Sequence, residues 1–119
     1  MSYKIKTDNA AQKLATMISC VKKRKDESGR EIDTWQIDGR SGANSGFFIH
    51  TEQQWEEKGY IHCSLSKLRE DILLVCFEYW DECEEENKSD DDEGILLGRF
   101  TELLINHFAD LNIKIKIEP

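Results

Sequence analysis

The chain has 119 residues, with 16 Lys or Arg against 24 Asp or Glu, so its formal net charge is −8 at pH 7. This length fits a single domain, residues 1–119, and the acidic balance argues against general binding to nucleic acid or to an anionic membrane. A hydrophobic fraction of 39% that includes 3 Trp and 5 Phe excludes disorder throughout the chain.

The N-terminal segment contains one firm helix. Residues 2–6 fit either a short strand or a frayed leader. Residues 9–23 follow the helical repeat, with Asp8 or Asn9 as the cap and the basic run 22–25 at the C-terminal end, where positive charge complements the helix dipole. The apolar residues on this repeat are Leu14, Met17, Ile18 and Val21.

The next segment has the composition of short strands. Residues 31–38 mix β-branched, aromatic and polar residues, and the Gly- and Ser-rich segment 39–46 follows as a flexible connection. Residues 47–49 then predict a second strand that pairs with the first as an antiparallel hairpin. A short helical turn is predicted for 51–58, and residues 60–63 predict a third strand.

Residues 64–86 allow two interpretations. Residues 72–77 alone look like a buried strand. Over the wider window, however, most charged residues fall in one arc of a helical wheel and most apolar residues fall opposite. This pattern predicts one long amphipathic helix from Ser64 to Glu86.

The C-terminal third is predicted to hold a second long helix and a strand. Residues 87–93 form an acidic turn, residues 93–110 an amphipathic helix, and residues 111–117 alternate apolar and polar side chains as a strand does. We therefore expect a small α+β domain. Its short, mainly antiparallel sheet of three or four strands is covered by an N-terminal helix and a C-terminal helical hairpin, with the last strand at the C-terminus.

The cysteines and histidines do not have the spacing of a catalytic or metal site. No CxxC pair occurs, and the spacing of the possible zinc ligands argues against a metal. A Cys63 nucleophile with His50 as base lacks an oxyanion loop, and a nuclease using His50 and His62 would repel its polyanionic substrate. We therefore expect free thiols and no metal, cofactor or catalytic residue. The zinc candidates considered are Cys63, Cys76, Cys83, His50, His62 and His107.

The sequence has neither an export signal nor a phosphate-binding motif. The N-terminus lacks the apolar core of a signal peptide, and no long apolar stretch is present, which favours a cytoplasmic protein. The loop 39–46 matches neither common phosphate-binding motif. No cofactor is therefore expected at that loop.

Negative charge is concentrated in the second half of the chain. Residues 1–60 carry 10 basic and 9 acidic side chains, whereas residues 61–119 carry 6 and 15. The tract 81–93 does not fit an EF-hand, because Glu86 stands where the loop requires Gly. It is either a solvated helix end and turn or a docking surface for a basic partner. The predicted partner-binding residues are Glu78, Asp81, Glu82, Glu85, Asp90, Asp91, Asp92 and the aromatic Trp80.

Size and acidity suggest a function in protein binding. In these two properties the chain is similar to bacterial immunity and antitoxin proteins, which neutralise cationic nuclease toxins. That resemblance implies a non-enzymatic protein whose carboxylates occlude the basic cleft of a toxin. The alternatives are a regulatory, adaptor or self-associating interaction domain and, third, a small enzyme.

Overall fold

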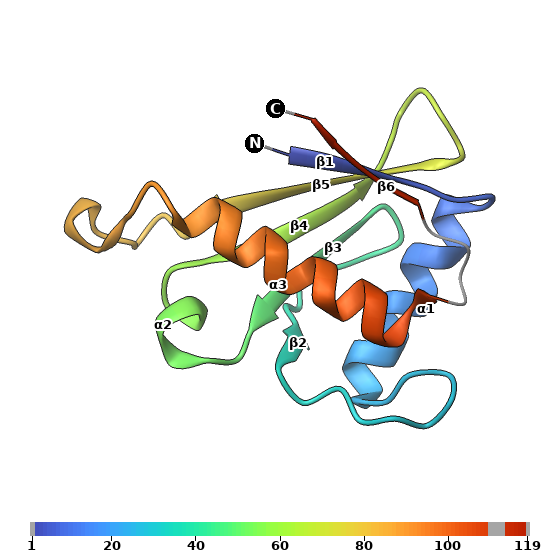
Figure 1. Cartoon of the computed structure of the whole chain (residues 1–119), viewed down its shortest axis with the longest axis horizontal. Helices are drawn as coiled ribbons and strands as arrows, with labels where there is room; N and C mark the ends of the chain where they lie inside the picture. Colours follow the sequence, from blue (N-terminus) through green and yellow to red (C-terminus); the bar gives the residue numbers. More distant parts are fainter. Residues whose placement is uncertain (1, 110–113, 119) are drawn as a thin grey trace.

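The computed structural model describes residues 2–109 and 114–118, which form a six-stranded antiparallel sheet and its helices (Figure 1). The strand order is β2-β3-β4-β5-β1-β6. This arrangement confirms the α+β class, although the sheet has six strands instead of three or four. The elements are β1 (Ser2–Lys6), α1 (Ala10–Lys23), β2 (Trp35–Ile37), β3 (Ser45–His50), α2 (Gln53–Glu56), β4 (Gly59–Leu65), β5 (Ile72–Tyr79), η1 (Glu85–Asn87), α3 (Asp92–His107) and β6 (Lys114–Glu118).

The two long helices form where the local sequence signals predict them. Asn9 caps α1, since its side chain accepts a hydrogen bond of 3.1 Å from the backbone N–H of Gln12. Arg24 ends the helix in the left-handed conformation with φ 62°. The helix predicted for residues 93–110 is α3, and Asp110 lies outside the described residues.

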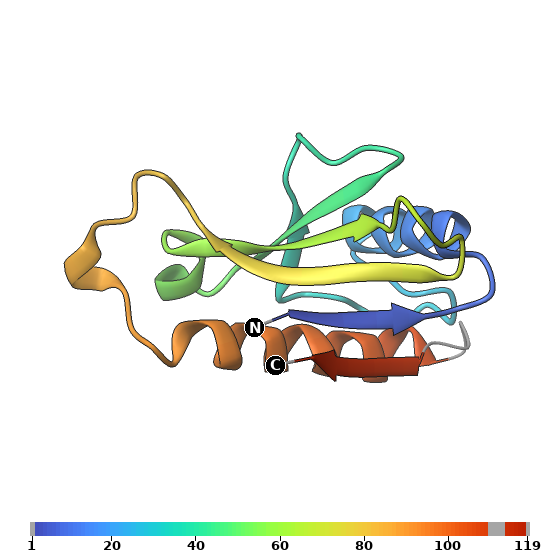
Figure 2. The ribbon, with the colours of Figure 1, turned by 90° about the horizontal axis from the view of Figure 1, so that it is seen from above.

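Helices α1 and α3 pack on the same face of the sheet, which we call the helical face. Phe48 of β3 is fully buried there with its ring centroid 5.0 Å from that of Phe100 in α3. Ile18 of α1 lies beside Gly46 on the same face of β3. Figure 2 shows α3 running along the sheet. The opposite face, which we call the open face, carries no helix of the described part of the chain.

The helix predicted for residues 64–86 is wrong. Residues 59–65 and 72–79 are the strands β4 and β5, joined by a turn in which Leu68 is 93% exposed. Burial alternates along β5, where Leu73 and Val75 are fully buried on the helical face and Leu74 lies on the open face. Because the open face also holds apolar side chains, the period of two is masked in the sequence. The predicted C-terminal helical hairpin is therefore wrong, since β5 stands in place of its first helix within the described residues.

The other predicted strands are confirmed in position, although only residues 35–37 of the segment predicted for 31–38 form a strand. β2 and β3 pair as an antiparallel hairpin, and β4 extends the strand predicted for 60–63. The strand predicted for 111–117 corresponds to β6, while its first residues, 111–113, lie outside the described residues. The uncertain segment 2–6 is the strand β1, which pairs with both β5 and β6. None of the described helices has the length and apolar character needed to cross a membrane.

Gly59 at the start of β4 fits only because it lacks a side chain. A Cβ at this position would overlap the backbone carbonyl oxygen of Glu78 and lie 2.7 Å from the Phe77 ring. Gly59→Ala should therefore lower the free energy of unfolding by about 2 kcal/mol, the typical penalty of overpacking. The matched control is Gly98→Ala in α3, where a Cβ meets nothing within 4 Å. Urea unfolding should show the control to be as stable as the wild type or more stable. An equal loss in both variants would contradict this explanation.

Candidate functional site

An aromatic cluster occupies the open face at one end of the central strands. Phe47 of β3 stacks on Tyr60 of β4 with ring centroids 5.4 Å apart, and Trp80, which directly follows β5, lies 4.6 Å from Tyr60. We call Phe47, Tyr60 and Trp80 the aromatic ledge. The guanidinium of Arg40 lies 4.7 Å, 5.1 Å and 4.9 Å from their respective ring centroids. These three contacts place the loop 39–46, which the sequence predicted to be a flexible connection, against the open face, and Arg40 also forms an ion pair of 2.9 Å with Asp38.

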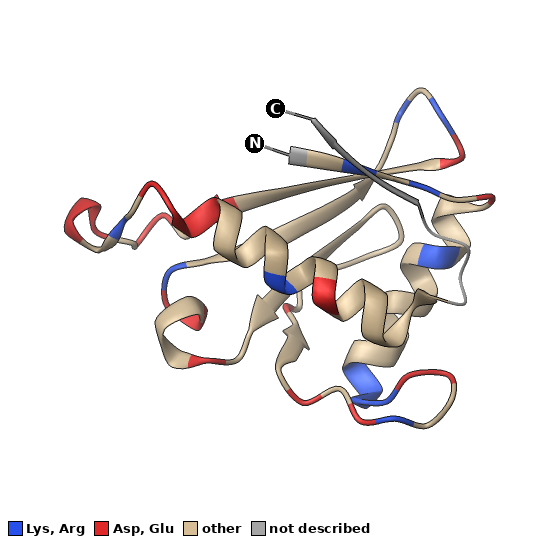
Figure 3. Cartoon of the chain, in the orientation of Figure 1, with Lys and Arg blue, Asp and Glu red and all other residues tan. Residues whose placement is uncertain are grey.

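The residues 81–91 follow the ledge directly and form an exposed loop, which we call the acidic loop. It holds seven carboxylates, and Lys88 is its one basic residue. Lys88 pairs with Glu85 at 2.8 Å. In Figure 3 this negatively charged segment projects beyond one end of the sheet, away from the basic end of α1. Its predicted partner-binding residues Asp81, Glu82, Glu85, Asp90 and Asp91 are all exposed.

A hollow of about 510 Å³ separates the acidic loop from α2. Carboxylates from both sides line it, and the Lys58 side chain lies at its wall. Such a lining favours a cationic group over an anion. The lining residues are Gln54, Glu57, Lys58, Glu82, Cys83, Glu84 and Asn87.

Two of the predicted partner-binding residues accept hydrogen bonds from other residues of the chain: Asp92, which is buried, and Glu78, which is exposed. Asp92 is 2% exposed and accepts hydrogen bonds from Lys58 at 3.0 Å and from Tyr79 at 2.8 Å, so its predicted surface role is wrong. Glu78 lies on β5, where its carboxylate accepts a hydrogen bond of 2.5 Å from the Tyr60 hydroxyl. Trp80 is half-buried, and its indole N–H donates to the Glu56 carbonyl at 2.9 Å.

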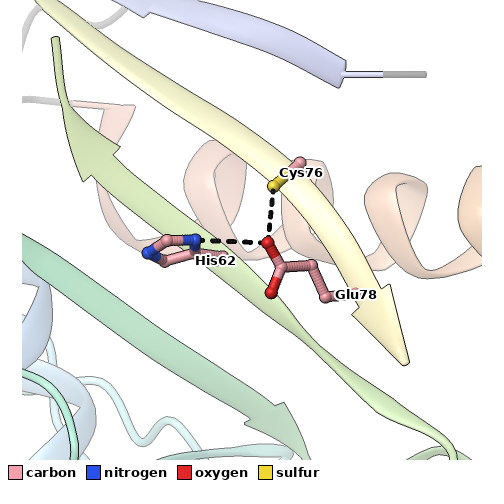
Figure 4. A group of neighbouring side chains, drawn as sticks. All are labelled: His62, Cys76 and Glu78. Atoms are coloured by element: carbon pink, nitrogen blue, oxygen red, sulfur yellow. Dashed lines mark hydrogen bonds and ion pairs between the residues drawn. The ribbon is translucent and has the colours of Figure 1, made fainter. Parts of the chain in front are cut away.

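Next to the ledge, the open face brings a histidine, a cysteine and a carboxylate together (Figure 4). The Nδ1 of His62 lies 3.5 Å from Oε1 of Glu78, and the Cys76 thiol donates to the same oxygen at 3.7 Å. The hydrogen bond from Tyr60 is the main cause that lowers the pKa of Glu78. Burial, followed by the charge of Glu78, raises the pKa of Cys76 to about 11. The thiol is therefore protonated near neutral pH, which disfavours a nucleophilic role.

The structure does not bring together the two catalytic pairs considered from the sequence, Cys63 with His50 and His50 with His62. Cys63 is fully buried on the helical face opposite Gly46, and burial raises its pKa to about 12. His50 is 5% exposed and packs edge-on against Trp35, with ring centroids 5.1 Å apart. Burial lowers the pKa of His50. His50 and His62 lie on opposite faces of the sheet, so they cannot share a substrate.

A second cluster, around Asp26, has a structural role. The buried Asp26 carboxylate accepts hydrogen bonds from His107 at 2.8 Å, from Ser28 and from Arg30. The bond to His107 is the largest cause of the lowered pKa of Asp26. These contacts tie the turn after α1 to the end of α3, and they leave the carboxylate no free position for a ligand.

No family model matches the chain, and neither a curated protein nor a solved structure matches it. The function of the chain must therefore be inferred from its own structure. The aromatic ledge, the acidic loop and the hollow beside α2 lie next to one another at the end of β5. Together they offer apolar rings beside exposed negative charge.

Proposed function

We propose that the chain is a non-enzymatic protein that binds a basic protein partner through the acidic loop and the adjoining aromatic ledge. The observation that carries the proposal is the position of the loop. Its carboxylates project into solvent directly after Trp80, and its one lysine is already paired with Glu85. Interfaces commonly combine aromatic anchors with a charged rim, and this end of the molecule supplies both.

The partner that fits this surface best is a cationic nuclease toxin, as for immunity and antitoxin proteins. A cleft that binds phosphates is basic, and carboxylates can take the place of the phosphates there. The hollow beside α2 would receive one lysine or arginine side chain of the partner. Exposed charges at the rim would act mainly on the rate of association, with a strong dependence on salt.

The test compares two variants of equal net charge. The loop variant carries Asp81→Ser, Glu82→Ser, Asp90→Ser and Asp91→Ser. The control variant carries Glu27→Ser, Glu31→Ser, Asp33→Ser and Glu70→Ser, which are exposed residues far from the loop. Wild type and both variants serve as baits in native lysate, and the association rate of a captured protein is measured against ionic strength.

We expect the wild type and the control variant to capture a basic nuclease and to inhibit its cleavage of nucleic acid. The loop variant should associate at least about tenfold more slowly at low salt and show a flatter salt dependence, because steering by charge is lost. Equal rates and salt slopes for all three proteins would contradict the proposed surface. A captured partner without nuclease activity would instead favour an adaptor role.

A further inference from the structure

The cluster on the open face has the donor set of a metal site, and the sheet determines its geometry. His62 of β4 and Cys76 of β5 are direct cross-strand partners. Glu78 follows two residues after Cys76, so its side chain lies on the same face of β5. The donor atoms of the three residues all lie within 4.8 Å of one another. Each comes from one of the two central strands of the sheet.

The spacing of these donor atoms matches that around a tetrahedral zinc ion. Zinc bonds of about 2.0–2.3 Å to nitrogen, oxygen and sulfur place two ligand atoms about 3.4–3.7 Å apart. The Oε1 of Glu78 already lies 3.5 Å from Nδ1 of His62 and 3.7 Å from Sγ of Cys76. A single metal ion therefore requires the imidazole and the thiol to approach each other by no more than about 1 Å.

The groups around the cluster hold it in place. The Tyr60 hydroxyl donates to Oε2 of Glu78 at 2.5 Å, which orients the carboxylate and leaves Oε1 directed at the other two donors. The His62 ring packs against Phe47 with ring centroids 4.6 Å apart. Such supporting contacts fix the orientation of metal ligands. The His62 side chain is 26% exposed and that of Glu78 is 45% exposed, so an ion can enter from solvent.

We propose that His62, Cys76 and Glu78 bind one zinc ion, with the fourth position open to water or to an incoming ligand on the open face. The combination of thiolate, imidazole and carboxylate selects zinc over calcium or magnesium, which prefer oxygen ligands alone. Formation of the zinc–sulfur bond releases the thiol proton of Cys76 to the buffer. The proposal does not rest on the binding of a basic partner, because none of the three ligands belongs to the acidic loop or to the aromatic ledge.

The experiment is a titration of the reduced, chelator-treated protein with Co²⁺, followed by displacement with Zn²⁺. Tetrahedral cobalt reports on its ligands through visible d–d bands, and a thiolate ligand adds a charge-transfer band in the near ultraviolet. We expect both signals with one equivalent of Co²⁺ and their loss on addition of Zn²⁺. Zinc should also raise the melting temperature of the wild type.

Variants identify the ligands. Cys76→Ser, His62→Gln and Glu78→Gln should each weaken Co²⁺ binding at least tenfold, and Tyr60→Phe, which keeps the ring, should weaken it by up to about tenfold. Cys83→Ser is the matched thiol control and should bind as the wild type does. The acidic-loop variant should do so as well, which distinguishes this site from binding by clustered carboxylates.

Two results would overturn the proposal. One is a wild-type cobalt spectrum without the thiolate band, which needs no variant and so does not depend on any variant's folding. The other is wild-type affinity in Cys76→Ser with a normal circular dichroism spectrum. Neither result would bear on the partner-binding proposal, because the three ligands belong to neither the acidic loop nor the aromatic ledge.

Discussion

Replacing Phe100 with Ala is expected to lower the free energy of unfolding by about 3–5 kcal/mol, the usual range for a large aromatic side chain in a core. Phe100 is fully buried at the centre of the helical face. Its ring contacts Phe48 and Trp35 edge-on, at centroid distances of 5.0 Å and 5.5 Å, so it joins α3 to the β2–β3 hairpin. Because domains of this size are stable by only about 5–15 kcal/mol, the variant should be close to unfolding at 37 °C.

Urea unfolding followed by tryptophan fluorescence measures this loss. The control is Ile105→Ala on the same helix, where the side chain is 62% exposed and the change should stay within about 0.5 kcal/mol. A loss below about 1 kcal/mol for Phe100→Ala would mean that the core closes around the cavity or that α3 packs differently.

The parts of the fold that were predicted correctly are those with complete local signals. Helix α1 has a cap at Asn9, one apolar stripe and basic residues in its last turn, and each of these signals acts within a few residues. The β2–β3 hairpin likewise follows from two short β-prone runs around a Gly-rich loop. Such elements can be predicted from a single sequence because their formation depends little on distant residues.

The sequence predicted a helix in place of β5 because the burial of this strand depends on residues that are distant in the sequence. Leu74 and Cys76 lie on the open face, where a strand with one solvated face would carry polar residues. The alternation of apolar and polar residues that is typical of a strand is therefore absent from β5. The charged residues in the turn 66–71 also fall where the polar face of a helix would lie, so the pattern resembled an amphipathic helix. Those same charges, with Leu68 exposed among them, are the signal that could have indicated a hairpin turn.

The cluster of His62, Cys76 and Glu78 was missed for the same reason. Spacing along the sequence separates His62 from Cys76, and only the register of β4 with β5 makes them neighbours. A hairpin centred on Arg69 places them directly opposite each other, so a correct assignment of the turn would have revealed the pair. The aromatic ledge also depends on cross-strand register, and the sequence predicted only Trp80 of its three members.

The acidic tract was predicted from charge alone, and its members now divide into two groups. Asp81, Glu82, Glu85, Asp90 and Asp91 are exposed and remain predicted partner contacts. Glu78 and Asp92 accept hydrogen bonds from other residues of the chain. Composition identified the negatively charged region, whereas only the fold shows which carboxylates accept hydrogen bonds within the chain and that Asp92 is buried.

The Asp92 carboxylate is expected to stabilise the fold. It holds three segments together, since Oδ1 accepts from Lys58 at 3.0 Å and Oδ2 accepts from Tyr79 and from the Ser89 backbone N–H, both at 2.8 Å. Asp92→Ala should lower the free energy of unfolding by about 3 kcal/mol, because it leaves the partly buried Lys58 ammonium and the Ser89 backbone N–H without their acceptor. The neighbouring Asp91→Ala, whose side chain is exposed and makes no cap hydrogen bond, should change it by no more than about 0.5 kcal/mol.

The effect of Asp92 should also depend on pH. Burial raises the pKa of this carboxyl group, but the hydrogen bonds from Ser89, Tyr79 and Lys58 lower it more, so it lies below its ordinary value. The folded state therefore binds the proton less readily than the unfolded state, and the carboxylate stabilises the fold above the unfolded pKa of about 3.9. This contribution is lost as the pH falls below that value. Urea unfolding at pH 7 and pH 3 should show a clear difference between wild type and Asp92→Asn at pH 7 and a smaller one at pH 3. A difference that stays constant or grows toward pH 3 would show that the charge of Asp92 does not stabilise the fold.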